Sequence, residues 1–116
     1  MSRQIGLRRR PQIYTTPDGR VVVDLTRRLV RVQGEIVHLT PKEFRLLAAL
    51  TRRAGEVVPH ETLLAEVWGP DVNEICRLKQ YIRYLRRKLE PDPHRPRYIL
   101  TMWGLGYYIV AQGRYP

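Results

Sequence analysis

The 116 residues suffice for one domain with a modest core, and 21 Lys and Arg against 11 Asp and Glu give a net charge of +10. This charge favours a polyanionic partner, and the 18 arginines against 3 lysines favour nucleic acid over a membrane surface, because guanidinium binds phosphates and guanine edges in a bidentate way. One cysteine excludes an internal disulfide and a multi-thiolate metal site, and no apolar run reaches the roughly 18 residues that span a membrane. We therefore expect a cytoplasmic protein without a signal peptide.

The first third of the chain predicts a basic arm followed by a small sheet. Residues 1–11 are basic and lack helical or strand periodicity, so we interpret them as an arm or a linker remnant. After them, short apolar stretches alternate with turn signals such as TPDG at 16–19 and QG at 33–34. We expect an antiparallel sheet of three or four strands, over residues 13–14, 21–25, 29–32 and 35–39.

Several helix-start signals coincide at residue 40. Thr40 can cap a helix, Pro41 suits the first helical position, and Glu43 completes a capping box. Apolar residues then keep a helical spacing until Gly55, which suits a left-handed C-terminal cap. The sequence therefore predicts a first helix between Thr40 and Gly55.

Two more helices and a hairpin are predicted next. The second helix covers about residues 59–68 and the third about residues 73–89. Three prolines between residues 91 and 96 forbid further helix, and residues 98–102 and 107–110 read as two strands joined by a glycine-bearing turn. Residues 12–112 are thus predicted to form an α+β winged helix-turn-helix domain, with residues 113–116 as a tail.

The third predicted helix has two different faces when each residue advances by 100°. One face is an apolar stripe that should anchor the helix on its own domain: Ile75, Leu78, Ile82, Leu85 and Leu89. No acidic residue lies between Cys76 and Leu89 on the other side. A merely solvated helix usually mixes both signs of charge, so we interpret this outer face as a nucleic-acid contact.

The outer face supplies candidates for reading DNA bases. Arg83 and Arg87 are four residues apart, and Gln80 lies three residues before Arg83, so the three side chains share one surface. Arginine favours the O6/N7 edge of guanine, and glutamine favours the N6/N7 edge of adenine. We predict that the helix enters the major groove and that these three residues contact bases.

Four motifs in order, across about residues 20–110, resemble the effector domains of OmpR/PhoB-type response regulators. They are residues 39–47 (LTPKEFRLL), residues 63–69 (LLAEVWG), residues 81–89 (YIRYLRRKL), and residues 96–101 with 104–107 (PRYILT and GLGY). The segments 69–70 and 92–96 are similar to the KdpE-like branch. The resemblance implies a four-stranded N-terminal sheet, three helices and a C-terminal wing. It also implies sequence-specific binding of double-stranded DNA in transcription regulation by a two-component system.

The resemblance also implies roles for further residues and partners. The helical spacing itself places Tyr84 on the outer face and Lys79 on its flank, and both are expected to join the base-contacting surface. The expected contacts to the DNA backbone are Arg77, Arg86, Trp68, Tyr81, Thr101 and Tyr107. The loop expected to touch RNA polymerase consists of Gly69, Pro70, Asp71, Val72 and Asn73. Members of the family commonly bind direct repeats as head-to-tail dimers, and they usually follow a phosphorylatable receiver domain.

Four residues depart from the family pattern, and one of them is Tyr108, at a position where an arginine often follows the Gly-x-Gly-Tyr motif. Trp103 stands at the wing tip beside Gly104, where the family often has an arginine that reaches into the minor groove. Its indole can pack on a sugar or wedge at a base step, or it can pack against its own domain or a neighbouring protomer. Lys79 replaces a frequent aspartate, which should change the accepted bases. Pro59 replaces a typical serine cap, so a hydroxyl contact is lost.

Other candidate sites are weaker. The three histidines lack a second ligand at metal spacing, so no metal is expected. Glu61, Glu66 and Glu74 have no nucleophile, phosphate-binding glycine loop or cofactor motif beside them, so no enzyme activity, cofactor or small-molecule ligand is expected. Cys76 is interpreted as a surface thiol, with a redox switch as the lesser alternative.

Two alternatives stay open at this point. The first concerns organisation: a receiver of about 120 residues is not part of this sequence, so the chain is either a cut-out effector domain or a stand-alone regulator. The second concerns function: a basic winged-helix module can also serve RNA or a protein partner. Binding that depends only on phosphates would ignore sequence, whereas base contacts would produce a clear sequence preference.

Overall fold

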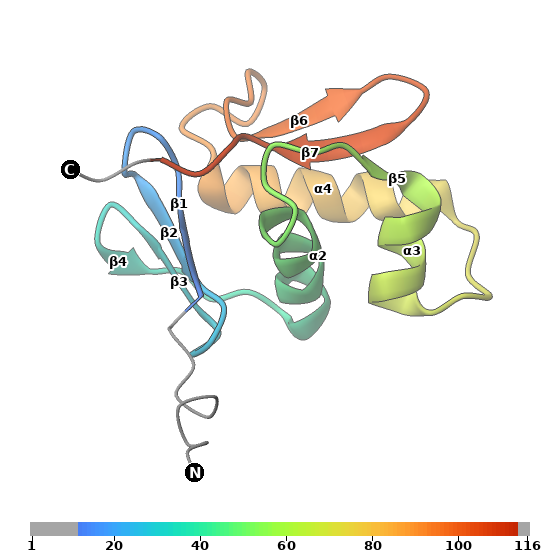
Figure 1. Cartoon of the computed structure of the whole chain (residues 1–116), viewed down its shortest axis with the longest axis horizontal. Helices are drawn as coiled ribbons and strands as arrows, with labels where there is room; N and C mark the ends of the chain where they lie inside the picture. Colours follow the sequence, from blue (N-terminus) through green and yellow to red (C-terminus); the bar gives the residue numbers. More distant parts are fainter. Residues whose placement is uncertain (1–11, 114–116) are drawn as a thin grey trace, which may run out of the picture.

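The computed structural model describes residues 12–113, so the predicted basic arm and residues 114–116 of the predicted tail lie outside it. Among the described residues, three helices lie between an N-terminal sheet at one end of the molecule and a second sheet that runs alongside the last helix (Figure 1). No helix in this range is long and apolar enough to cross a membrane. The arrangement confirms the predicted winged-helix fold.

The N-terminal sheet is an antiparallel meander in the order β1-β2-β3-β4. Its strands in the described range are β1 (Ile13–Thr15), β2 (Val21–Asp24), β3 (Leu29–Val32) and β4 (Glu35–Ile36). The turn before β4 has positive φ at both Gln33 and Gly34, 52° and 84°, as a two-residue hairpin requires. β4 is shorter than predicted, because after the bond from Val37 N to Val30 O (2.8 Å) the chain leaves the sheet towards the first helix.

Helix α2 (Pro41–Thr51) begins with the predicted capping box. Thr40 Oγ1 accepts a hydrogen bond from Glu43 N (3.2 Å), and Thr40 N donates to Glu43 Oε1 (2.9 Å). The predicted end is wrong, because Arg52 is the C-cap, in ordinary right-handed geometry. Gly55 does have a positive φ, but its N–H donates to Ile109 O (2.8 Å) and ties the following turn to the last strand.

Helices α3 (His60–Trp68) and α4 (Ile75–Leu89) follow close to their predicted ranges. The N-cap of α3, Pro59, makes no side-chain capping bond. Four residues of the predicted stripe on α4 are buried in the core: Leu78, Ile82, Leu85 and Leu89. The prediction for Ile75 is wrong, since 41% of its surface is exposed. Ile75 is the first residue of α4 and lies at the edge of the cleft described below.

The second sheet contains the predicted C-terminal hairpin and one strand that the sequence did not reveal. The hairpin consists of β6 (Ile99–Met102) and β7 (Gly106–Ile109), and β5 (Val58–Pro59) pairs with β7, giving the order β5-β7-β6. A two-residue strand that ends in proline has no periodicity to detect, and proline is tolerated there because β5 is an edge strand. We call this hairpin with its turn, residues 98–110, the wing.

We expect Gly106→Ala to destabilise the protein by about 1–3 kcal/mol, because a Cβ there would lie 1.9 Å from Val58 O and would force β5 and β7 apart. Chemical denaturation would measure the change. The matched control is Gly104→Asn, since a Cβ at Gly104 meets no atom within 4 Å and asparagine tolerates the positive φ of 82°. Equal stability of the two variants would contradict the expectation.

Candidate nucleic-acid interface

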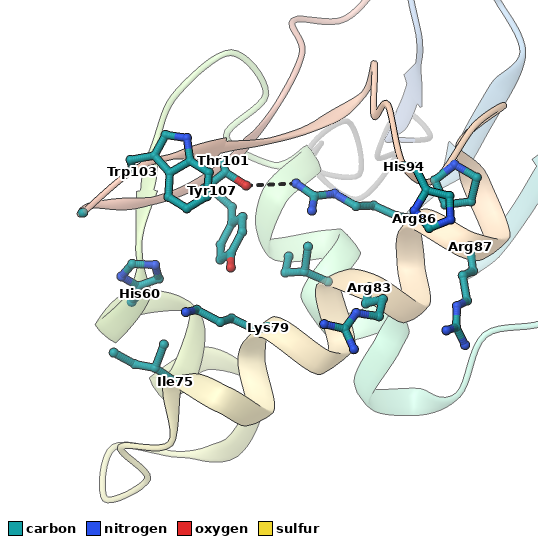
Figure 2. A pocket seen from close by; sticks show the side chains of 13 residues that line it. His60, Ile75, Lys79, Arg83, Arg86, Arg87, His94, Thr101, Trp103 and Tyr107 are labelled. Carbon is teal, nitrogen blue, oxygen red and sulfur yellow. Dashed lines mark hydrogen bonds between the residues drawn. The ribbon is translucent and has the colours of Figure 1, made fainter.

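A cleft of about 720 Å³ separates α4 from the wing (Figure 2). Among the predicted site residues, its lining includes Lys79, Arg83, Arg86 and Arg87 from α4, and Thr101, Trp103, Gly104 and Tyr107 from the wing. Ile75 and the side chains of His60 and His94 complete the rim. Residues from α4, the wing, the start of α3 and the loop after α4 therefore form one basic and aromatic cleft.

The cations of α4 differ in what they contact. Lys79, Arg83 and Arg87 are exposed, and within residues 12–113 none of them makes an ion pair. Arg77, in contrast, pairs with Glu74 across a distance of 2.9 Å at the surface. The free positive charge of α4 is consequently concentrated on the edge that faces the cleft.

Lys88 is used inside the protein. Its Nζ lies 2.7 Å from Glu43 Oε1 and 3.1 Å from His38 O, so it joins the end of α4 to the start of α2. The Glu43 carboxylate is almost fully buried and also completes the capping box with Thr40. In the sequence Lys88 lies on a helix face without a counter-charge, whereas in the fold its counter-charge comes from Glu43 of α2.

Arg86 connects α4 to the wing. Its Nε and Nη2 donate to Ile99 O at 3.1 and 3.0 Å, and Nη2 also donates to Thr101 Oγ1 at 3.0 Å. Partial burial lowers the pKa of Arg86, although an arginine stays protonated at neutral pH. The DNA-backbone contacts expected of Arg86 and Thr101 stay predictions; in this structure their polar groups bind each other and set the angle of the wing.

Two aromatic residues among the predicted backbone contacts, Trp68 and Tyr81, form a cluster with Tyr84 outside the lining of the cleft, whereas Tyr107 lines the cleft. Trp68 packs edge-to-face on Tyr81, with ring centroids 5.1 Å apart, and Tyr81 packs on Tyr84 at 5.3 Å. The Trp68 Nε1 atom is buried and has no hydrogen-bond partner in the described part of the chain. Tyr107 is also buried, lies edge-on to His60 at 5.6 Å, and has a pKa that burial raises.

The remaining predicted contacts lie at the start of α4. Gln80 and Arg77 line a shallow hollow with Cys76, which is an exposed free thiol. The loop predicted to touch RNA polymerase joins α3 to α4; Val72 packs against the core, while Pro70, Asp71 and Asn73 are exposed. Within the described range, no group of three His, Cys, Asp or Glu is placed to hold a metal ion.

Glu90 is a positioning residue that sequence reasoning missed. It is buried, and its carboxylate accepts hydrogen bonds from the backbone N–H groups of Arg97, Tyr98 and Ile99 at 2.7 to 3.1 Å. These bonds fix the start of the wing against the end of α4. An acid between a helix and a proline looks like a surface residue, so the sequence held no signal for this contact.

A family model described as "Transcriptional regulatory protein, C terminal" matches residues 34–109. The KDP operon transcriptional regulatory protein KdpE of Escherichia coli is 47% identical over 105 residues, which cover 85% of this chain and 47% of that protein. The chain therefore spans about half the length of the curated relatives it matches.

Solved structures with the same fold include proteins of two bacteria. The response regulator DrrB of Thermotoga maritima, described as an OmpR/PhoB homologue, superposes with a TM-score of 0.77 and 37% identity over 85% of this chain and 44% of its own. The RstA DNA-binding domain of Klebsiella pneumoniae, in complex with the RstA box, gives a TM-score of 0.71 and 25% identity over 85% of this chain and 97% of its own.

We expect Arg86→Met to lower the free energy of unfolding by about 1–3 kcal/mol, because the carbonyl of Ile99 and the hydroxyl of Thr101 lose a charged donor. Arg87→Met is the matched control on the same helix. Its exposed side chain should change stability by less than about 0.5 kcal/mol. Thermal or denaturant unfolding measures both, and an equal effect of the two substitutions would show that the contact with the wing contributes nothing.

Proposed function

Because the chain belongs to the family of C-terminal domains of transcriptional regulatory proteins, in its OmpR/PhoB-type winged-helix form, we propose that it binds double-stranded DNA in a sequence-specific way and regulates transcription. The observation that carries this proposal is the division of α4. One face is locked in the core, while Lys79, Arg83 and Arg87 are exposed and unpaired among the described residues at the edge of the cleft.

In this proposal α4 lies in the major groove. The buried residues of α4 fix the rotation of the helix about its own axis, so Arg83 and Arg87 face outwards together. Either guanidinium can donate two hydrogen bonds to the O6 and N7 atoms of a guanine, and Gln80 can recognise an adenine. Lys79 and Tyr84 flank these residues and complete the proposed set of base contacts.

Contacts to the phosphates set the register of the helix on DNA. We propose Arg77, Arg86, Trp68, Tyr81, Thr101 and Tyr107 for this role. Arg77 would exchange its surface pair with Glu74 for a phosphate, which costs little because exposed ion pairs are weak. Arg86 and Thr101 contribute mainly by holding the wing, since their polar groups already bind each other.

We also propose the setting in which this domain acts. The relatives are about twice as long as this chain, which supports a role as the effector domain of a two-component response regulator behind a receiver domain, or as a stand-alone relative. The exposed part of the loop between α3 and α4 is free to touch RNA polymerase. Two copies would bind direct repeats head to tail.

The relatives are transcriptional regulators, so we propose no catalytic role. The alternative of an RNA- or protein-binding module is not favoured.

Selection from a library of random duplexes tests this function. We expect an enriched motif that binds roughly 10³-fold or more tightly than unrelated duplexes. Arg83→Ala should relax the preference at one base position, with a loss of about 1–3 kcal/mol of discrimination there.

Arg52→Ala is the charge-matched control for Arg83→Ala. Arg52 is exposed at the end of α2, beside the N-terminal sheet and away from the cleft, so the recovered motif should be unchanged. Recovery of no enriched motif would overturn the proposal of a sequence-specific regulator.

A further inference from the structure

The wing combines complete lack of charge with an apolar tip. Residues 98–110 contain no Lys, Arg, His, Asp or Glu. At the tip, Trp103 is 87% exposed, Leu105 is 60% exposed and Met102 is 39% exposed. On the facing side of the cleft, Lys79, Arg83 and Arg87 of α4 carry unpaired positive charge within the described range (Figure 2). Charge and apolar surface are thus divided between the two walls of one cleft.

The tip is firmly mounted although Trp103 itself is uncovered. Leu105 N donates to Met102 O (3.0 Å) to close the turn, and His60 N donates to Leu105 O (3.1 Å), which ties the turn to α3. Pairing of β5 with β7 and the bonds from Arg86 hold the strands behind it. The backbone that carries Trp103 is therefore already ordered, so binding has to order the indole side chain but not the turn.

We propose that Trp103 packs against a deoxyribose and a base edge of the bound DNA, on the minor-groove side of one strand. The phosphates of this strand are those that the cations of α4 attract. This inference rests on the proposed function. An element beside a helix in the major groove meets the bordering strand and the next minor groove. Apolar side chains can wedge there, and indole rings stack on bases of any sequence. The contact of the wing is accordingly non-ionic.

Charge complementarity selects DNA over a second copy of the chain as the occupant. The tip projects over a cleft whose other wall carries cations, and those cations would repel the same surface of another copy. In addition, the exposed surface area of Met102, Trp103 and Leu105 is far too small for a stable protein interface, which buries about 800 Å² on each partner.

The salt dependence of binding separates this contact from an ionic one. Each phosphate neutralised by a cation contributes about 0.9 to the slope of log K against log salt concentration, whereas an apolar contact contributes nothing. We expect Trp103→Ala to weaken binding about 5- to 150-fold, the range for one aromatic contact with a base, at an unchanged slope. Arg77→Ala, at a residue proposed to bind a phosphate, should instead reduce the slope by about 0.9.

The experiment measures the affinity of the 116-residue chain for the duplex enriched by selection, between about 50 and 200 mM salt. Trp103→Phe should retain most of the affinity because it keeps an aromatic face. Trp103→Arg should increase the slope by about 0.9 because it adds an ionic contact. Since Trp103 is exposed, all these variants should unfold at the temperature of the unmodified chain, which excludes misfolding as a cause.

Tryptophan emission provides an independent measurement. The chain has two tryptophans, Trp103 and the partly buried Trp68, and DNA should shift and quench the emission of Trp103. Trp68 is itself a proposed phosphate contact, so the signal of Trp103 is the part of this change that is lost in Trp103→Phe, where only Trp68 still emits.

Each outcome has a defined meaning. If the unmodified chain binds no duplex, the proposed function fails and this inference with it. If the chain binds DNA but Trp103→Ala binds equally well or changes the slope, or the emission of Trp103 stays unchanged, only the inference is overturned. A shift in emission with protein concentration alone, together with a dimer in sedimentation, would assign the tip to a second copy and also overturn it.

Discussion

Burial of the apolar face of α4 is the constraint on which the remaining structure depends. Leu78, Ile82, Leu85 and Leu89 lie in the same core as the leucines of α2 and α3. Their spacing leaves the helix one orientation about its axis, because any rotation would expose large apolar side chains to water. The outward direction of Arg83 and Arg87 is a consequence of this burial rather than of any contact that they make themselves.

Polar contacts at the end of α4 then connect this helix to the rest of the molecule. Glu90 holds the start of the wing, and Arg86 holds β6. Arg20 Nη1 donates to Leu89 O (2.5 Å), which brings the N-terminal sheet to the same point. Buried charged groups are tolerated here because each is hydrogen-bonded. The cleft between α4 and the wing therefore has a fixed geometry before any partner arrives.

The same contacts reduce the number of cations that are available to a partner. Arg86 is bound to the wing and Lys88 to Glu43, and Arg77 has a partner at the surface. The unpaired cations that remain on the described part of α4, Lys79, Arg83 and Arg87, lie at the cleft, next to a wing that carries no charge at all. Two kinds of surface, a charged one on the helix and an apolar one on the wing, thus lie on neighbouring but separate elements.

Local patterns in the sequence determined the fold and the identity of the exposed helix. The capping box at Thr40, the glycine turns and the stripe on α4 depend on neighbours within a few residues, so periodicity and turn chemistry were sufficient to find them. The family motifs depend on the same kind of short pattern, and they led to the correct family.

Tertiary structure decided which charged residues are free. Glu90, β5 and the partners of Arg86 and Lys88 involve residues 7 to 50 positions away, and no local pattern encodes such contacts. In the sequence all the cations of α4 look equally available, whereas in the folded chain some of them already form hydrogen bonds or ion pairs with other elements.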